Sequence, residues 1–309
     1  MKKTIALLLI IVTITGCQFM PVKKEQIAVP DIHTGVNGVT LEFLENAPPA
    51  EIYEERPFDI IVKVHNQGAN DVRGGMLLIG VEEQNVELTG QKDLRFDLAG
   101  KSAYNPEGVF DMKQFRATAR KLSPAAGKIY PTTVTATACY AYKTAATALV
   151  CIDTDLLGIV KNKPCKTSTQ SYGSGQGAPV AVTSVVPKML PHADPEMITP
   201  EFTISIANRG VGDVVAGEKI YEACSGKKLG QESWNAVKIS ASLSDQYLEC
   251  KPSVLKIVTG ENKAVCTITG GISKELGTYL APLSIELDYG YMSRKVKSMS
   301  ITRLLGSSY

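Results

Sequence analysis

The feature that most constrains the fold is a strand-and-turn pattern that occurs twice. Residues 59–72 alternate apolar and polar side chains, end the alternation in Asn-x-Gly and reach Asp-Val after a short spacer, and residues 201–214 do the same. Alternation with a period of two places Ile and Val on one face of a β-sheet. Asn and Gly also tolerate the positive φ angles expected in the turn after the strand. The repeat therefore predicts two related β units.

A Tyr-x-Tyr pair near the end of each unit extends this repeat. Cys-Tyr-Ala-Tyr ends an alternating stretch at 139–142, and Asp-Tyr-Gly-Tyr ends another at 288–291. The offset from Tyr140 to Cys151 equals that from Tyr289 to Ser300, which predicts one closing hairpin of the same length in each unit. Both rings of each pair should share one strand face, beside the core or at the domain rim. Chance β patterning is the alternative to duplication.

The length of the chain fits two domains of this kind, since about 290 residues remain after the N-terminal segment described below. Short strands separated by Gly, Pro, Asn and Asp turns are typical of two-layer sandwiches. We predict an all-β chain with two tandem immunoglobulin-like β-sandwich domains at 38–160 and 180–305. Residues 161–179 read as a flexible linker because they are rich in Gly, Ser and Thr. Residues 109–122 fit either a strand or a short helix over the sandwich.

The N-terminus has the pattern of a lipoprotein signal peptide. Two lysines precede a short apolar run at 5–14, and Ile-Thr-Gly-Cys follows, with small residues before Cys17. The run is short for a membrane span. Residues 1–16 are therefore predicted to be the signal peptide, and 17–37 the lipidated Cys17 with a short flexible tether. An uncleaved anchor, or a plain secretory signal in which Cys17 falls after the cleavage site, is the alternative.

Loss of this signal cancels the net charge. The chain has 33 basic and 31 acidic residues, so removing Lys2 and Lys3 leaves 31 of each. Nucleic-acid binding proteins carry a surplus of Lys and Arg on one face. No nucleic-acid partner is expected.

The cysteine count indicates disulfides. Of the seven cysteines, six follow Cys17, and an even number outside the cytoplasm is typical of a disulfide framework. Two pairs flank predicted turns, so each pair should lie on adjacent strands, and the remaining two cysteines are left to each other. Pairing is predicted between Cys139 and Cys151, between Cys250 and Cys266 and, by elimination, between Cys165 and Cys224.

Metal ligands are sparse. There is no Cys-x-x-Cys pair, and His33, His65 and His192 are scattered, so zinc is not expected. Asp153 and Asp155 offer carboxylates to calcium, but calcium takes six to eight ligands. A loop in solvent is the preferred interpretation, and no cofactor is predicted.

Signals for catalysis are equally weak. Gly-Ser-Gly-Gln-Gly at 173–177 has neither the strand-turn-helix context of a nucleophile elbow nor the ending of a phosphate loop. Adjacent carboxylates such as Glu54 and Glu55 point to opposite faces of a strand, which suits no acid/base pair. Trp234 is the one tryptophan and is expected in the core or a hairpin. We expect no enzymatic activity.

The strand ends and the tandem units resemble the cell-adhesion-related, CARDB-like immunoglobulin-fold modules of bacterial and archaeal surface proteins. The overall layout is similar to lipoproteins of small-genome archaea. This resemblance implies an extracytoplasmic location and an immunoglobulin-like fold, and it supplies no catalytic residues. It rests on the Asn-x-Gly strand ends and on three short segments, at 42–49, 139–142 and 175–180.

The sequence thus predicts a membrane-anchored, extracytoplasmic module for binding, adhesion or spacing, with a protein or another envelope component as partner. A structural subunit of a surface filament, in which edge strands pair between molecules, is the alternative. An accessory domain of an envelope hydrolase system is a third interpretation.

Overall fold

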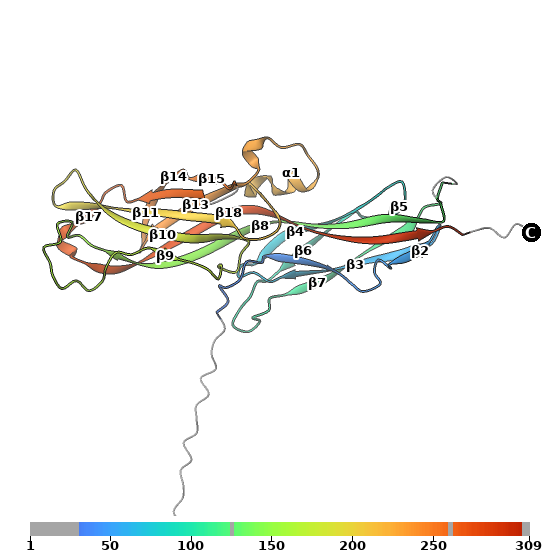
Figure 1. The fold of residues 1–309 in the computed structure, drawn as a ribbon, viewed down its shortest axis with the longest axis horizontal. Helices are drawn as coiled ribbons and strands as arrows, with labels where there is room; N and C mark the ends of the chain where they lie inside the picture. Colours follow the sequence, from blue (N-terminus) through green and yellow to red (C-terminus); the bar gives the residue numbers. More distant parts are fainter. Residues whose placement is uncertain (1–30, 124–126, 259–261, 305–309) are drawn as a thin grey trace, which may run out of the picture. The chain divides into compact units, whose positions relative to one another are not determined.

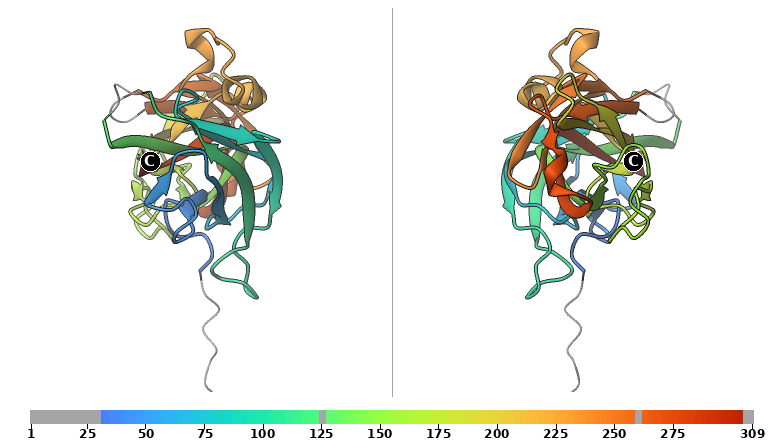
Figure 2. Two further views of the ribbon diagram at one scale, coloured as in Figure 1. Left: turned by 90° about the vertical axis from the view of Figure 1, so that its right-hand side faces the viewer. Right: turned by 90° about the vertical axis from the view of Figure 1, so that its left-hand side faces the viewer.

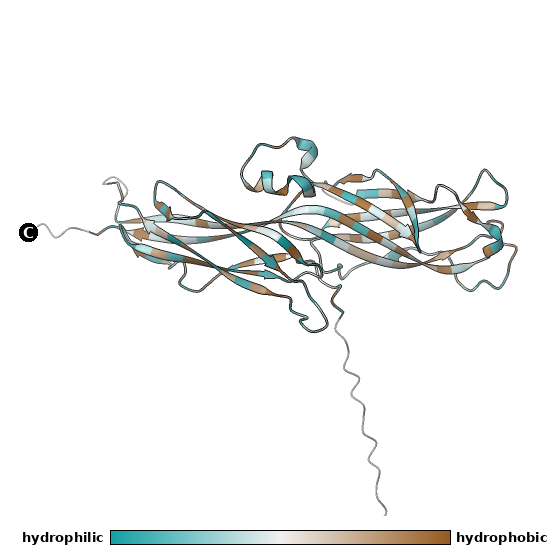
Figure 3. Ribbon diagram, turned by 180° about the vertical axis from the view of Figure 1, so that it is seen from behind, coloured by the Kyte–Doolittle hydropathy of each residue, from teal (hydrophilic) through white to brown (hydrophobic). Residues whose placement is uncertain are grey.

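The alternating segments form antiparallel β-strands, and the chain has the predicted all-β sandwich fold. The computed structural model describes residues 31–123, 127–258 and 262–304. Figure 1 shows the strands, and Figure 3 shows apolar and polar residues alternating along them. The strands of the first half are β1 (Val39–Phe43), β2 (Glu51–Tyr53), β3 (Pro57–Asn66), β4 (Val72–Val81), β5 (Val86–Thr89), β6 (Asp93–Leu98), β7 (Phe110–Ala119) and β8 (Ile129–Ile152).

The second half adds ten strands and short helices. Its strands are β9 (Gln170–Ser171), β10 (Val180–Pro191), β11 (Met197–Asn208), β12 (Asp213–Val215), β13 (Ala236–Leu243), β14 (Gln246–Lys251), β15 (Val254–Lys256), β16 (Asn262–Thr267), β17 (Ile272–Ser273) and β18 (Tyr279–Thr302). The helices are η2 (Gly217–Lys219), α1 (Ile220–Cys224), η3 (Gln231–Ser233) and η4 (Lys274–Leu276). Residues 109–122, which fitted a strand or a helix, contain the strand β7. No helix among the described residues is long and apolar enough to cross a membrane.

The first sandwich combines strands from both ends of the chain. One layer is the four-stranded sheet β1-β3-β7-β5. The other contains β6, β4, the N-terminal half of β8 and the C-terminal half of β18, with β2 parallel to β18. Ile60, Leu77 and Phe115 are among the buried residues that form its core.

The second sandwich uses the remaining halves of the two long strands. One layer contains β10, β11 and β16 with the short β9 and β17, and the other contains β13 and β15 beside β18 and β8. Strand β14 pairs with β13 and then with β16, so it passes from one layer to the other. Phe202, Ile204 and Leu287 belong to its core, which is continuous with that of the first sandwich.

Strands β8 and β18 run through both sandwiches. They are antiparallel neighbours in unbroken register, from Ile129 opposite Thr302 to Ile152 opposite Tyr279. Each strand has 24 residues, which corresponds to about 80 Å of extended chain. The predicted closing hairpins are therefore wrong. Residues 141–150 contain no Gly, Pro, Asn or Asp, and a full-length partner strand keeps this segment extended.

Sharing these strands changes how the halves are divided. The sequence was divided into consecutive domains at 38–160 and 180–305, but each sandwich receives half of a long strand from the other segment. The chain from Asp31 onward forms one compact unit. The sandwiches are consequently joined through paired strands as well as through the connecting segment.

The end of the predicted linker is a packed part of this unit. Gly177 N donates to Gly35 O at 2.9 Å, and Ala69 N donates to Gly177 O at 2.7 Å. Gln176 is buried and exchanges two hydrogen bonds with the backbone of Val182. A flexible linker was expected from composition, and that expectation is wrong for this segment because its glycines permit close packing between backbones.

The Asn-x-Gly repeat has the same hydrogen bonds in both copies. The Oδ1 atoms of Asn66 and Asn208 accept from the amides of Gly68 and Gly210, each at 3.1 Å. Each Nδ2 donates to the carbonyl four residues further along, at 2.8 and 2.9 Å. The duplication in sequence is thus a duplication in structure.

The glycine of this motif is required by packing. Its φ angle was expected to be positive, but neither Gly68 nor Gly210 has a positive φ. A Cβ atom on Gly68 would lie 1.8 Å from the hydroxyl oxygen of Tyr142, and one on Gly210 would lie 2.2 Å from that of Tyr291. The Asn-x-Gly motif and the Tyr-x-Tyr motif therefore contact each other. The tyrosine hydroxyl leaves no room for a side chain at the glycine position.

Candidate functional site

Four buried tyrosines meet where β8 and β18 pass from one sandwich to the other. Tyr140 lies opposite Tyr291, and Tyr142 lies opposite Tyr289. The centroids of neighbouring rings are 5.5, 6.0, 6.2 and 6.3 Å apart, so the four rings form a closed cycle of contacts, the tyrosine cluster. The rings of each pair share a strand face as predicted. The meeting of the two pairs was not predicted, because it depends on the register of β8 and β18.

The hydroxyls of this cluster bind backbone amides symmetrically. Tyr140 accepts a hydrogen bond from the Val39 amide at 2.9 Å, and Tyr289 accepts one from the Val180 amide at 3.3 Å. Val39 and Val180 begin β1 and β10, which have equivalent places in the two halves. Tyr140 thus fixes the start of β1, and Tyr289 fixes the start of β10.

The other two hydroxyls bind the turns that follow the Asn-x-Gly motif. Tyr142 accepts from the Asn70 amide at 3.2 Å, and Tyr291 accepts from the Gly212 amide at 2.7 Å. Burial raises the pKa of Tyr142 to about 12 and also raises the pKa values of the other three phenols. The phenols therefore remain protonated at neutral pH, and their hydroxyls bind the backbone.

A hollow of about 480 Å³ lies next to this junction. Small residues such as Ala141 and Ala236 line it, together with Glu218 from η2. Lys238 and Asp288, which also line it, are opposite each other on β13 and β18. Neither Lys238 nor Glu218 forms an ion pair within the described part of the chain. The hollow therefore has both a cation and an anion on its walls.

A lobe formed by residues 216–235 borders the hollow, and Figures 1 and 2 show its helix α1 on the outside of the sheets. A disulfide between Cys139 and Cys224 ties this helix to β8. Ile220 and Met292 pack with it in a small hydrophobic cluster separate from the main core. Trp234, predicted for the core or a hairpin, packs against this cluster. The sequence analysis did not predict the lobe.

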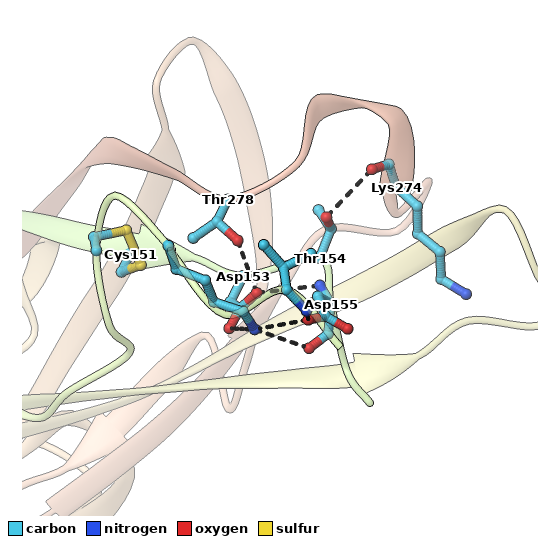
Figure 4. A network of polar contacts seen from close by, with 9 residues as sticks. Cys151, Asp153, Thr154, Asp155, Lys274 and Thr278 are labelled. Carbon is cyan, nitrogen blue, oxygen red and sulfur yellow. Dashed lines mark hydrogen bonds and ion pairs between the residues drawn. A yellow bond between two sulfur atoms is a disulfide. The ribbon is translucent and has the colours of Figure 1, made fainter. Parts of the chain in front are cut away.

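The side chains of Asp153 and Asp155, labelled in Figure 4, are both bound by Lys163. Lys163 Nζ lies 2.6 Å from Asp153 Oδ2 and 3.2 Å from Asp155 Oδ2. We call these three residues the Asp–Lys clamp. Its ammonium group lies between the carboxylates, where a calcium ion would need to bind. Within the described residues, no group of three or more His, Cys, Asp or Glu side chains is placed to hold a metal.

The clamp is charged at neutral pH. A hydrogen bond from the Val160 amide is the main cause that lowers the pKa of Asp155 to about 2. Burial raises the pKa of Asp153, but hydrogen bonds from Lys163 and Thr278 outweigh it, so this pKa is lowered. The hydrogen bond to Asp153 raises the pKa of Lys163. With both carboxylates ionised and one ammonium between them, the clamp carries a net charge of −1.

All six cysteines after Cys17 form disulfides, but only one predicted pairing is confirmed. Cys250 and Cys266 are opposite each other on β14 and β16. The other two pairings are wrong because β8 is continuous, so two cysteines expected across a hairpin lie on one extended strand. The pairs formed instead are Cys139 with Cys224 and Cys151 with Cys165.

The remaining candidates have local roles or lie outside the described residues. His65 Nε2 contacts Glu107 O at 2.8 Å, and His192 Nδ1 accepts from the Asp194 amide at 3.0 Å. Glu54 is buried and accepts hydrogen bonds from the backbone amides of Leu122 and Leu304. Each of these groups stabilises neighbouring backbone. Cys17 and the rest of the predicted signal peptide lie outside the described residues.

Comparisons with known proteins give no family. No protein-family model and no curated protein matches the chain. Among solved structures, it is similar to the secreted serine protease VesC from Vibrio cholerae, with 8% sequence identity and a TM-score of 0.22. The match covers 84% of this chain and 50% of that protein, so the chain spans half the length of this structural neighbour. At this TM-score the similarity carries no argument about fold or function.

Proposed function

We propose that the protein is a lipid-anchored, non-catalytic module that binds, adheres or spaces at the extracytoplasmic face of the cell membrane. The observation that carries this proposal is the continuous pairing of β8 and β18 through both sandwiches. A shared pair of long strands resists bending between the halves better than a linker. Such a unit holds its two sandwiches at a fixed distance from each other.

The disulfides support an extracytoplasmic location, since disulfides form and persist in oxidising compartments. The signal-like N-terminus supports attachment through Cys17. Two acyl chains give durable membrane attachment because each buried methylene contributes about 0.8 kcal/mol. The CARDB-like resemblance of the sequence agrees with this location.

The sheet edges favour a binding or spacing module over a filament subunit. Strand β9 covers Ser184 and Val185 of β10, and Gln176 covers Val182, so residues 186–191 of β10 form the exposed edge. That edge contains Pro187, Lys188 and Pro191, and prolines lack the N–H needed to pair with another strand. Strand addition at this edge is therefore disfavoured.

The anchor is tested by feeding cells a clickable palmitate analogue and comparing the full-length protein with its Cys17→Ser variant. We expect label on the wild type, no label on the variant, and release of most of the variant into the soluble fraction. Equal labelling of both proteins, or an unlabelled wild type, would refute lipid anchoring.

The size of the Cys17→Ser protein in solution distinguishes a binding or spacing module from a filament subunit. Size-exclusion chromatography with light scattering should give the mass of one chain. Polymers that grow with concentration would favour the filament subunit. Lys188→Val, on the exposed edge of β10, is compared with the Cys17→Ser protein in the same measurement. This substitution removes a charge that opposes pairing of the edge with another chain.

A further inference from the structure

An apolar turn projects from the segment that follows β8. Leu156, Leu157, Ile159 and Val160 have exposed fractions of 38%, 85%, 73% and 53%. We call these four residues the apolar tip. Isolated exposed apolar residues are ordinary, but four of them within five positions mark a contact surface.

The apolar tip is held in place from beneath. The disulfide between Cys151 and Cys165 closes the segment at its base. Above it, Asp155 accepts a hydrogen bond from the Val160 amide at 2.8 Å, and Lys163 bonds to both carboxylates of the Asp–Lys clamp. Thr154 is buried and donates to Lys274 O at 3.2 Å. A prearranged turn loses little conformational freedom when its side chains become buried in a partner.

The charges around the apolar tip match an anionic surface. Lys163 neutralises one of the two carboxylates of the clamp, and the net charge of −1 that remains is outweighed by Lys161 and Lys166. Lys161 and Lys166 are exposed on the same segment, and neither forms an ion pair among the described residues. The segment therefore combines exposed aliphatic side chains with unpaired cations.

This composition fits a lipid surface better than a protein. Protein interfaces are enriched in aromatic residues, Met and Arg and depleted in Lys, and a stable one buries about 1,000 Å² or more. The apolar tip has no aromatic residue, is followed directly by Lys161 and comprises four side chains. Leu, Ile and Val beside Lys are typical of segments that enter the headgroup region of an anionic bilayer.

We propose that the apolar tip inserts into the interface of an anionic membrane as a second, reversible contact. This inference rests on the proposed anchor, which keeps the protein beside a bilayer. The segment from Cys17 to Asp31 spans at most about 50 Å when fully extended, so an anchored protein meets the bilayer at high effective concentration. A weak contact then suffices to set the orientation of the protein on the membrane.

The test uses the Cys17→Ser protein, which lacks the anchor, and sedimentation with two kinds of vesicle. One is phosphatidylcholine alone, and the other contains about one third phosphatidylglycerol. We expect binding to the anionic vesicles, and a loss of about tenfold or more with Leu157→Asp/Ile159→Asp. Val211→Asp is the matched control, because Val211 is fully exposed on a different turn. It should leave binding unchanged.

A second measurement detects insertion directly. Leu157→Trp should shift its fluorescence to the blue when anionic vesicles are added, whereas the protein with only Trp234 should not. Absence of vesicle binding, equal binding by the Leu157→Asp/Ile159→Asp protein, or equal loss in the Val211→Asp control would each overturn the proposal. Palmitate labelling of Cys17 is independent of these outcomes. The proposals of a lipid anchor and of membrane insertion by the apolar tip can therefore be refuted separately.

Discussion

The two halves of the molecule are alike at their junction and different on their outer surface. Both halves have the Asn-x-Gly turn and a tyrosine that packs on its glycine. Each also has a strand, β1 or β10, whose first amide binds a tyrosine hydroxyl. Within the described residues, only the second half has a lobe, which lies between β12 and β13 and has a disulfide to β8. The apolar tip likewise occurs once among the described residues, at the end of the second sandwich, where the segment after β8 bonds to Lys274 and Thr278. The repeated residues therefore maintain the junction, and the residues present in one copy form the candidate contact surfaces.

The largest expected effect concerns the lobe. The Cys139–Cys224 disulfide joins residues 85 positions apart, whereas Cys151–Cys165 joins residues 14 apart. Loss of the first by double alanine substitution should lower the free energy of unfolding by about 4–5 kcal/mol, and loss of the second by about 3 kcal/mol, because longer loops lose more entropy when closed. Urea unfolding without reductant measures both.

The control for this comparison is the Cys250–Cys266 disulfide, which joins residues 16 apart within the second half. Its removal should resemble that of the shorter loop. If removal of Cys139–Cys224 costs no more than the other two, the lobe contributes only locally and does not stabilise the junction.

The next effect tests the repeat itself. Asn66 is fully buried and donates a third hydrogen bond to Leu98 O at 3.1 Å, whereas Asn208 is only partly buried and accepts its third from the Tyr291 hydroxyl at 3.4 Å. Asn66→Ala should therefore cost about 2–3 kcal/mol and Asn208→Ala about 1–2 kcal/mol in urea unfolding. An equal cost would mean that burial does not distinguish the two copies.

The tyrosine cluster should respond symmetrically. Tyr140→Phe and Tyr289→Phe keep the ring but leave the buried amides of Val39 and Val180 without that partner. Each substitution should cost about 1–2 kcal/mol. Val180 and Val39 begin equivalent strands, so a cost confined to one of the two variants would contradict the equivalence of the halves.

These comparisons also explain what the sequence could predict. The repeat, the strands and the Cys250–Cys266 pair follow from local alternation and turn residues, which a single sequence displays. The pairing of β8 with β18 depends on contacts between distant segments, and equal spacing after each Tyr-x-Tyr pair was misread as a hairpin. That single error also produced the wrong partners for Cys139 and Cys151. Lys163 was not assigned to the Asp pair because its position depends on the Cys151–Cys165 closure.

The smallest expected effect is the response of the Asp–Lys clamp to acid, which is confined to the second sandwich. The folded-state pKa of Asp155 is about 2, below its ordinary 3.8. A carboxylate with a lowered pKa stabilises the fold fully above the ordinary value, and this contribution is lost as the pH falls toward the folded-state pKa. The Asp–Lys clamp should therefore loosen between about pH 4 and pH 2. Carboxyl-carbon NMR titration of the aspartates follows this directly.

The Lys163→Gln variant separates the two carboxylates of the clamp. The pKa of Asp155 should stay below its ordinary value, because the Val160 amide is the main cause of its shift. The pKa of Asp153 should rise, because burial then opposes a weaker set of hydrogen bonds. If both pKa values rise together, the ammonium group controls both carboxylates and the turn beneath the apolar tip depends on Lys163 alone. If neither rises, the backbone holds this turn, and vesicle binding by Lys163→Gln should equal that of the parent protein.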